Sequence, residues 1–159
     1  LSKAYSMPGL RIGWVVGPEK VIAECWRRHD SITISPGVLS DKIAQLVMQP
    51  ENRTKLYART SKIIGSNREY FKNWIDSFDG FLEYIEPAAG AIAFVKYNSD
   101  FPSIELAERF RVNQGVLTVP GGQMGMEGFI RLNLGPERDK FEEGLKRIEK
   151  ELESLKVSV

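Results

Sequence analysis

A chain of 159 residues has room for one ordinary domain, or for one domain with a piece of another. Its 22 basic and 21 acidic residues nearly cancel, which argues against a nucleic-acid or membrane surface. One cysteine and one histidine exclude an internal disulfide and a Cys/His metal cluster, and no apolar run reaches the length of a membrane span. The chain begins without a methionine or a signal-peptide layout, so we expect a cytoplasmic protein whose first residue is a cut.

The first informative stretch runs from residue 1 to residue 14 (LSKAYSMPGLRIGW). The Pro8-Gly9 pair predicts a turn, and the apolar residues 12–16 predict a strand. Lys3 is therefore expected on a loop and Arg11 at the start of a strand, where the turn can fold both cations toward one site. An amine and a guanidinium in one place suit a ligand that carries both a carbonyl and a phosphate.

Two helices are predicted next. Apolar spacing indicates one between Pro18 and His29, and a second from residue 38 to the Gln49-Pro50 pair that ends it. Cys25 falls on the apolar face of the first helix, so we interpret it as a packed small hydrophobic residue rather than a nucleophile. His29 has no catalytic partner in view.

Residues 51–78 show apolar side chains at steps of three, four and seven, which predicts one long helix that Asp79-Gly80 ends. A helix of this length is typical of a connection between domains. We therefore place the domain boundary at its start, with residues 1–50 belonging to a first domain and residues 51–159 to the helix and a second domain.

The second domain is predicted to be a short sheet covered by helices. The predicted strands cover residues 81–86, 91–97, 116–119 and 128–135. One predicted helix has Ser103 as its N-cap and another begins at Pro136. In the last helix the apolar residues step by four, three, four and three, the spacing of a helix-packing seam.

The last predicted strand carries an arginine among hydrophobic residues (FIRLNL, residues 129–134). Alternation places Ile130 and Leu132 on one face, with Arg131 and Asn133 on the other. An arginine in mid-strand needs a counter-charge, and its planar guanidinium fits a carboxylate through two parallel hydrogen bonds. That carboxylate belongs either to a substrate or to an Asp or Glu of the same domain, and the strand alone leaves both interpretations open.

Two motifs together carry a family resemblance that covers essentially the whole chain. Ser2-Lys3 is followed after seven residues by Arg11 and then Gly13, with Pro-Gly-Leu before the arginine, and FIRLNLG follows downstream. This pattern resembles the class I/II (fold type I) pyridoxal-phosphate aminotransferases. The glycine-rich stretch 120–125 is similar to the loop that precedes the arginine strand in that family, or is a plain connection.

The resemblance implies pyridoxal 5'-phosphate as the cofactor. Lys3 matches the lysine that forms the Schiff base, and its freed amine would take and return the substrate α-proton. Arg11 matches the arginine that binds the cofactor phosphate. Ser2 adds a hydroxyl near that phosphate, or serves only the structure of the loop. Arg131 matches the arginine that binds the substrate α-carboxylate.

The resemblance also implies that this chain is the C-terminal part of a longer protein. Residues 1–50 then form the remnant of the cofactor-binding large domain, and residues 51–159 the interdomain helix and the small domain. We expect the fragment to be inactive alone, and the full-length protein to be a homodimer that moves an amino group between an amino acid and a 2-oxo acid. The alternatives are another enzyme of the same fold, such as a carbon–sulfur lyase, a decarboxylase or a cyclopropane-forming synthase, and a non-catalytic regulatory domain.

Overall fold

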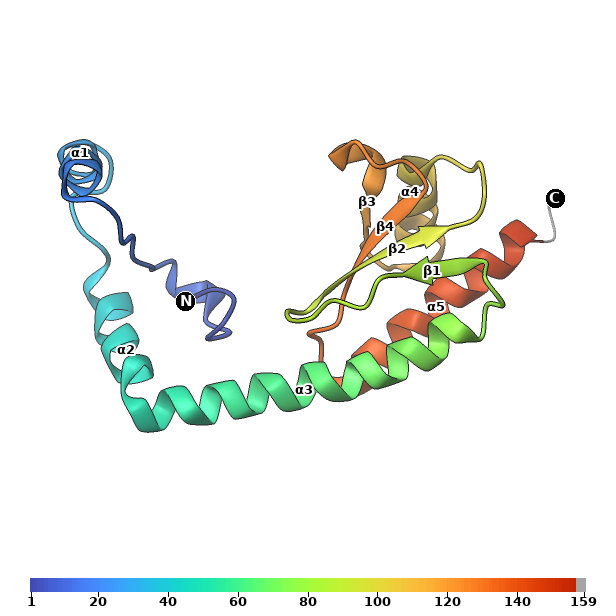
Figure 1. The fold of residues 1–159 in the computed structure, drawn as a ribbon, viewed down its shortest axis with the longest axis horizontal. Coiled ribbons are helices and arrows are strands. Elements are labelled where there is room, and N and C mark those ends of the chain that lie inside the picture. The colour runs from blue at the N-terminus through green and yellow to red at the C-terminus, as the bar shows by residue number, and fades with distance from the viewer. Residues whose placement is uncertain (157–159) are drawn as a thin grey trace. The chain divides into compact units, whose positions relative to one another are not determined.

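The computed structural model describes residues 1–156, and the chain folds into two compact units, Leu1–Ser61 and Lys62–Val159. Helix α3 (Pro50–Asp76), the long helix that the sequence predicts, contributes residues to both units (Figure 1). The domain boundary expected after residue 50 stays a prediction. None of the helices within the described residues is both long and apolar enough to cross a lipid bilayer.

The first unit is helical. It contains a short 3-10 turn η1 (Pro8–Leu10), helix α1 (Glu19–His29), helix α2 (Val38–Met48) and the beginning of α3. In α2 the buried residues are Ala44 and Val47, which lie three positions apart and so share one helical face. The helix ends at Gln49, whose backbone is extended because the following proline disfavours the helical conformation in the residue before it.

Two predictions for this unit were wrong. Residues 12–16 form no strand, because a strand needs a neighbour to bond its backbone N–H and C=O groups and the described part of this unit contains no other strand. Cys25 is exposed rather than packed. No residue of α1 is buried, and Trp26 is 69% exposed, because nothing in the described part of this unit covers the apolar face of the helix.

The second unit contains one antiparallel sheet with the strand order β1-β2-β4-β3. The strands are β1 (Leu82–Tyr84), β2 (Ile92–Tyr97), β3 (Val119–Pro120) and β4 (Phe129–Asn133), and the helices besides α3 are α4 (Ser103–Gln114) and α5 (Arg138–Lys156). The order places β4, the strand of Arg131, between β2 and β3. A short sheet covered by helices is the fold class that the sequence predicts, and it is confirmed.

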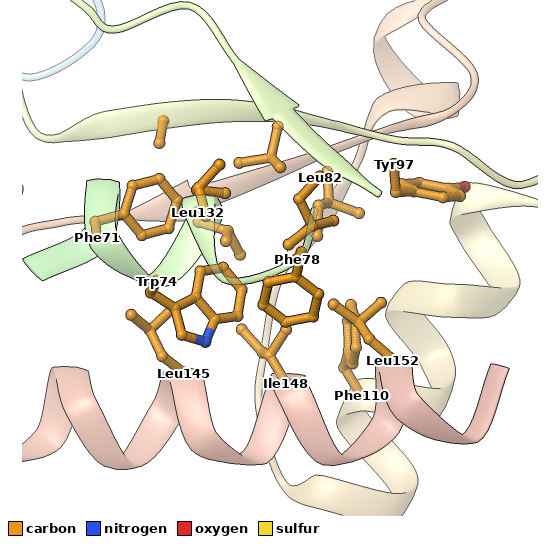
Figure 2. Packing of buried hydrophobic residues seen from close by; sticks show 14 of the residues in the cluster. Phe71, Trp74, Phe78, Leu82, Tyr97, Phe110, Leu132, Leu145, Ile148 and Leu152 are labelled. Carbon is orange, nitrogen blue, oxygen red and sulfur yellow. The ribbon is translucent and has the colours of Figure 1, made fainter. Parts of the chain in front are cut away.

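One face of this sheet packs against α3, α4 and α5 around a single core. Figure 2 shows Phe71 of α3 beside Leu132 of β4, and Trp74 of α3 between Leu132 and the row of apolar side chains that α5 contributes, among them Leu145 and Ile148. Alternation along β4 sends Ile130 and Leu132 into the core, as predicted. The other face of β4, with Arg131 in its middle, is therefore directed away from the core.

Candidate functional site

Lys3 lies on an exposed loop at the start of the chain. The Ser6 N–H donates to the Lys3 carbonyl over 3.0 Å, and the Leu1 nitrogen donates to the Ile12 carbonyl over 3.3 Å. The second bond joins the two ends of the segment that carries Lys3 and Arg11. Ser2 is half-buried in the same loop. Among the described residues, no hydrogen bond or salt bridge involves the Lys3 amine, which leaves it available to a ligand.

Aromatic rings anchor this loop to the first part of α3. Tyr5 is 8% exposed, and its ring centroid lies 5.3 Å from that of Tyr57 and 6.3 Å from that of Trp14. The hydroxyls of Ser6 and Thr60 lie 3.1 Å apart and share a hydrogen bond. A hydrogen bond with the Tyr5 side chain raises the pKa of Tyr57 above its ordinary value, so the Tyr57 hydroxyl keeps its proton near pH 7.

No motif of the sequence predicts this anchor. Tyr57 and Thr60 are three residues apart on α3 and so lie on one helical face, which is the face that receives the loop. A polar residue three positions from an aromatic one on a long helix is too common a pattern to identify such a contact.

Arg11 ends the 3-10 turn η1 in the left-handed conformation, with φ at 50°. Its backbone N–H and its Nη1 both donate to the Pro8 carbonyl, over 3.4 and 3.0 Å. No acidic side chain of the described residues pairs with its guanidinium, which is exposed. The remaining N–H donors of Arg11 have no hydrogen-bond partner within residues 1–156, and a phosphate is the kind of anion that such a fork of donors binds.

Arg131 occupies the middle of β4, opposite Phe94 of β2 and Val119 of β3. It is exposed, and within residues 1–156 no carboxylate forms a salt bridge or hydrogen bond with it. The sequence left open a partner Asp or Glu in the same domain, and the structure contains no such pair among these residues. Phe129, on the same face, stacks on Phe94 with ring centroids 4.9 Å apart. Arg131 thus shares its face of the sheet with an aromatic pair, and no carboxylate of the described chain compensates its charge.

The first unit therefore brings together the segments of Ser2, Lys3 and Arg11, whereas Arg131 belongs to the second unit. No group of His, Cys, Asp and Glu side chains suited to a metal ion exists within the described part of the chain. The chemistry that these residues offer is anion binding by two guanidinium groups and nucleophilic or acid–base action by one amine. Their assigned roles stay predictions.

The chain is similar in sequence and in structure to known proteins. The family model described as aminotransferase class I and II matches residues 1–148. A capreomycidine synthase of Streptomyces vinaceus is 32% identical over 96% of this chain and 39% of its own length. An aspartate aminotransferase of Pyrococcus horikoshii is 26% identical over 98% of this chain and 40% of its own length.

Among solved structures, a PLP-dependent aminotransferase from Streptococcus suis superposes with a TM-score of 0.89 and 31% identity, over 96% of this chain and 40% of that one. The chain thus spans about two fifths of the length of the relatives it matches. The matched region begins in the lysine loop and ends within α5. This chain belongs to the class I and II aminotransferase family.

Proposed function

We propose that the protein to which this chain belongs is a pyridoxal-phosphate-dependent aminotransferase that moves an amino group between an amino acid and a 2-oxo acid. The family match and the similarity to an aspartate aminotransferase support this reaction class. The observation in the structure that carries the proposal is the uncompensated guanidinium of Arg131 in the middle of a sheet strand. Such a group is suited to the carboxylate that amino acids and 2-oxo acids have in common.

Pyridoxal phosphate fits the residues of the lysine loop. The Lys3 amine is unengaged, and the Arg11 guanidinium has donors free of any acidic partner in the described chain. Lys3 would hold the cofactor covalently, and Arg11 with the Ser2 hydroxyl would bind its phosphate. When bound, this cofactor supplies an electron sink that stabilises negative charge at the substrate α-carbon.

The residues of this chain then have separate tasks. The Lys3 amine would take the proton from the substrate α-carbon and deliver it to the cofactor carbon that receives the amino group. Arg131 binds the α-carboxylate through two parallel hydrogen bonds, which limits the orientations that the substrate can adopt. Tyr5, held between Trp14 and Tyr57, keeps the loop of Lys3 in one place. The family resemblance further supports a homodimer as the working form of the full-length protein.

The experiment uses the full-length protein supplied with pyridoxal phosphate. A panel of amino acids, each with its amino nitrogen isotopically labelled, is incubated with 2-oxoglutarate as acceptor. We expect the label to appear in glutamate together with the 2-oxo acid of one donor, and Lys3→Ala to abolish the transfer. A protein that binds the cofactor yet moves no label from any donor would contradict the proposal.

A second candidate is a synthase reaction on an amino-acid substrate. It is favoured by the similarity to capreomycidine synthase, which at 32% identity exceeds the 26% of the aspartate aminotransferase. The same incubation separates the two reactions, because a synthase keeps the labelled nitrogen in the product whereas a transferase passes it to the acceptor. Lys3 and Arg11 would serve either reaction in the same way, so the motifs do not distinguish them.

A further inference from the structure

Strand β3 is too short to fix its own alignment with β4. It consists of Val119 and Pro120, which lie opposite Arg131 and Ile130. Proline has no N–H to donate, so Pro120 cannot form a backbone hydrogen bond to a neighbouring strand through its nitrogen. The alignment of Val119 beside Arg131 must therefore depend on the loop, residues 121–128, that joins the two strands.

That loop is bound to the beginning of helix α4 through Ser103. The Ser103 hydroxyl accepts a hydrogen bond from the Gly122 N–H over 2.9 Å, and the Ser103 N–H donates to Glu127 Oε1 over 2.5 Å. The Gly128 N–H donates to the same carboxylate oxygen over 3.2 Å. Ser103 is fully buried, so one buried residue binds the loop near both of its ends.

The role of Ser103 differs from the one that the sequence predicts. Instead of capping α4 it is the first residue of that helix, after Pro102 as N-cap, and its hydroxyl is engaged by the loop. The carboxylate of Glu127 supplies the cap in its place, since it accepts the free Ser103 N–H at the positive end of the helix. That backbone hydrogen bond lowers the pKa of Glu127 below its ordinary value, which keeps the carboxylate charged.

Two glycines, Gly121 and Gly122, allow the loop to pack closely against Ser103 and to fold back on itself. A Cβ atom on Gly122 would lie 2.5 Å from Glu127 Oε2 and 2.9 Å from the Ser103 hydroxyl. A Cβ atom on Gly121 would lie 2.1 Å from the Met126 carbonyl. A side chain at position 121 would collide with backbone atoms, and one at position 122 would displace the Glu127 carboxylate from its place beside Ser103, so both glycines favour the contact between Glu127 and Ser103.

We propose that Glu127 is a positioning residue for Arg131. Its carboxylate fixes the loop against α4, and the loop sets how β3 lies beside β4 and so where the Arg131 guanidinium is directed. The inference rests on the proposed function, in which Arg131 binds the substrate carboxylate. Glu127 lies four residues before Arg131 and touches neither substrate nor cofactor in this proposal.

The test compares two amine donors in the full-length holoenzyme. One donor is the amino acid that gives the fastest turnover, and the other is the amine that lacks only its α-carboxylate. We expect Glu127→Ala to lower kcat/KM for the amino acid about tenfold, mainly through KM, and to leave kcat/KM for the amine unchanged. Ser103→Ala should act in the same direction, and the double variant should lose less than the two single losses combined, because the two residues form one unit.

Two further variants serve as controls. Glu127→Gln keeps a side-chain oxygen that can accept the Ser103 N–H, so it should retain most of the wild-type kcat/KM even if Glu127→Ala folds poorly. Glu105→Ala removes an acidic residue from the first turn of the same helix, where no hydrogen bond of the described residues involves its side chain, and should match the wild type.

The outcomes separate this inference from the proposed function. If Arg131→Lys leaves the preference for the amino acid over the amine intact, Arg131 does not bind the carboxylate and the site proposal fails. If Arg131→Lys abolishes that preference while Glu127→Ala and Ser103→Ala keep it, the positioning role is overturned. An equal loss toward both donors in Glu127→Ala would also overturn it, since it would indicate general damage to the fold.

Discussion

The side-chain amide of Asn67 donates a hydrogen bond to the Leu134 carbonyl over 2.9 Å, across 67 positions of sequence. The same nitrogen donates to the Pro136 carbonyl over 2.8 Å. Asn67 is 1% exposed within α3, and the two carbonyls belong to the segment that leads from β4 into α5. The end of the strand that carries Arg131 is thus fixed to the long helix by one buried amide.

We expect Asn67→Ala to lower the free energy of unfolding by about 1–3 kcal/mol, because the Leu134 carbonyl loses its donor at a buried position and the Pro136 carbonyl at a partly buried one. Denaturant unfolding of the 159-residue chain measures this difference. Asn73→Ala is the matched control, because Asn73 is exposed on the same helix, and it should change stability by less than about 0.5 kcal/mol. Equal effects of the two substitutions would show that the buried amide does not stabilise the fold.

An element of this fold is predicted correctly from the sequence when the elements that it packs against or pairs with belong to the same unit of the chain. Alternation along β4 predicts the buried faces of Ile130 and Leu132 because the core that receives them is made by the helices of the same unit. The long helix ends near Asp79-Gly80, as predicted, and both residues adopt positive φ there. The strand predicted over residues 12–16 fails for the opposite reason, since no strand of the described unit pairs with it.

In the candidate site, too, the sequence predicts some features and not others. The motif identifies Lys3, Arg11 and Arg131 because each carries a charge in a position that the chain itself does not explain. The contacts of Asn67, Ser103 and Glu127 could not be predicted from the sequence, because these side chains bind backbone groups far away along the chain. Periodicity reports which face of an element is buried, but it carries no information about which backbone group a buried polar side chain will meet.

Glu151 is a buried acidic residue of the second unit, and the contribution of its carboxylate to stability can be tested. Its carboxylate accepts hydrogen bonds from Arg109 Nε over 2.6 Å, Asn113 Nδ2 over 3.0 Å and Gln114 Nε2 over 3.0 Å, all from α4. Burial alone raises the pKa of Glu151, but the hydrogen bonds from these three side chains outweigh it and hold the pKa below the ordinary value of 4.5. The stabilising contribution is therefore present above that value and is lost as the pH falls through the lower pKa of the folded state.

We expect Glu151→Ala to lower the free energy of unfolding at neutral pH by about 2–3 kcal/mol, because three donors lose their acceptor and Arg109 is left partly buried. The loss should shrink as the pH is lowered from the ordinary carboxyl pKa through the lower pKa of the folded state, where the folded wild-type residue gains its proton. Glu153→Ala, an exposed position on the same helix, should match the wild type at both pH values. A stability difference between Glu151→Ala and wild type that does not change with pH would contradict the charged network.

The contact between Tyr5 and Tyr57 should determine how firmly the lysine loop is held. An aromatic pair contributes about 1 kcal/mol beyond the area that it buries, so Tyr57→Ala should raise the amide hydrogen-exchange rates of the loop about fivefold. Tyr57→Phe keeps the ring and loses only the hydroxyl, so it should preserve most of the protection. Unchanged exchange in Tyr57→Ala would mean that Ser6 and Thr60 alone hold the loop.

The availability of the Lys3 amine leads to the last prediction. Incubation of the full-length protein with pyridoxal phosphate, followed by borohydride, should leave a stable adduct on the peptide that contains Lys3, because this amine has no partner in the described chain and lies in the same loop as the Arg11 guanidinium. Lys3→Ala should remove the adduct, whereas Lys20→Ala, at an exposed lysine of the same unit, should leave it in place. Peptide mass spectrometry reads the position directly. Labelling spread evenly over exposed lysines such as Lys20 and Lys42 would show that the loop confers no selectivity, and the assignment of Lys3 would have to be abandoned.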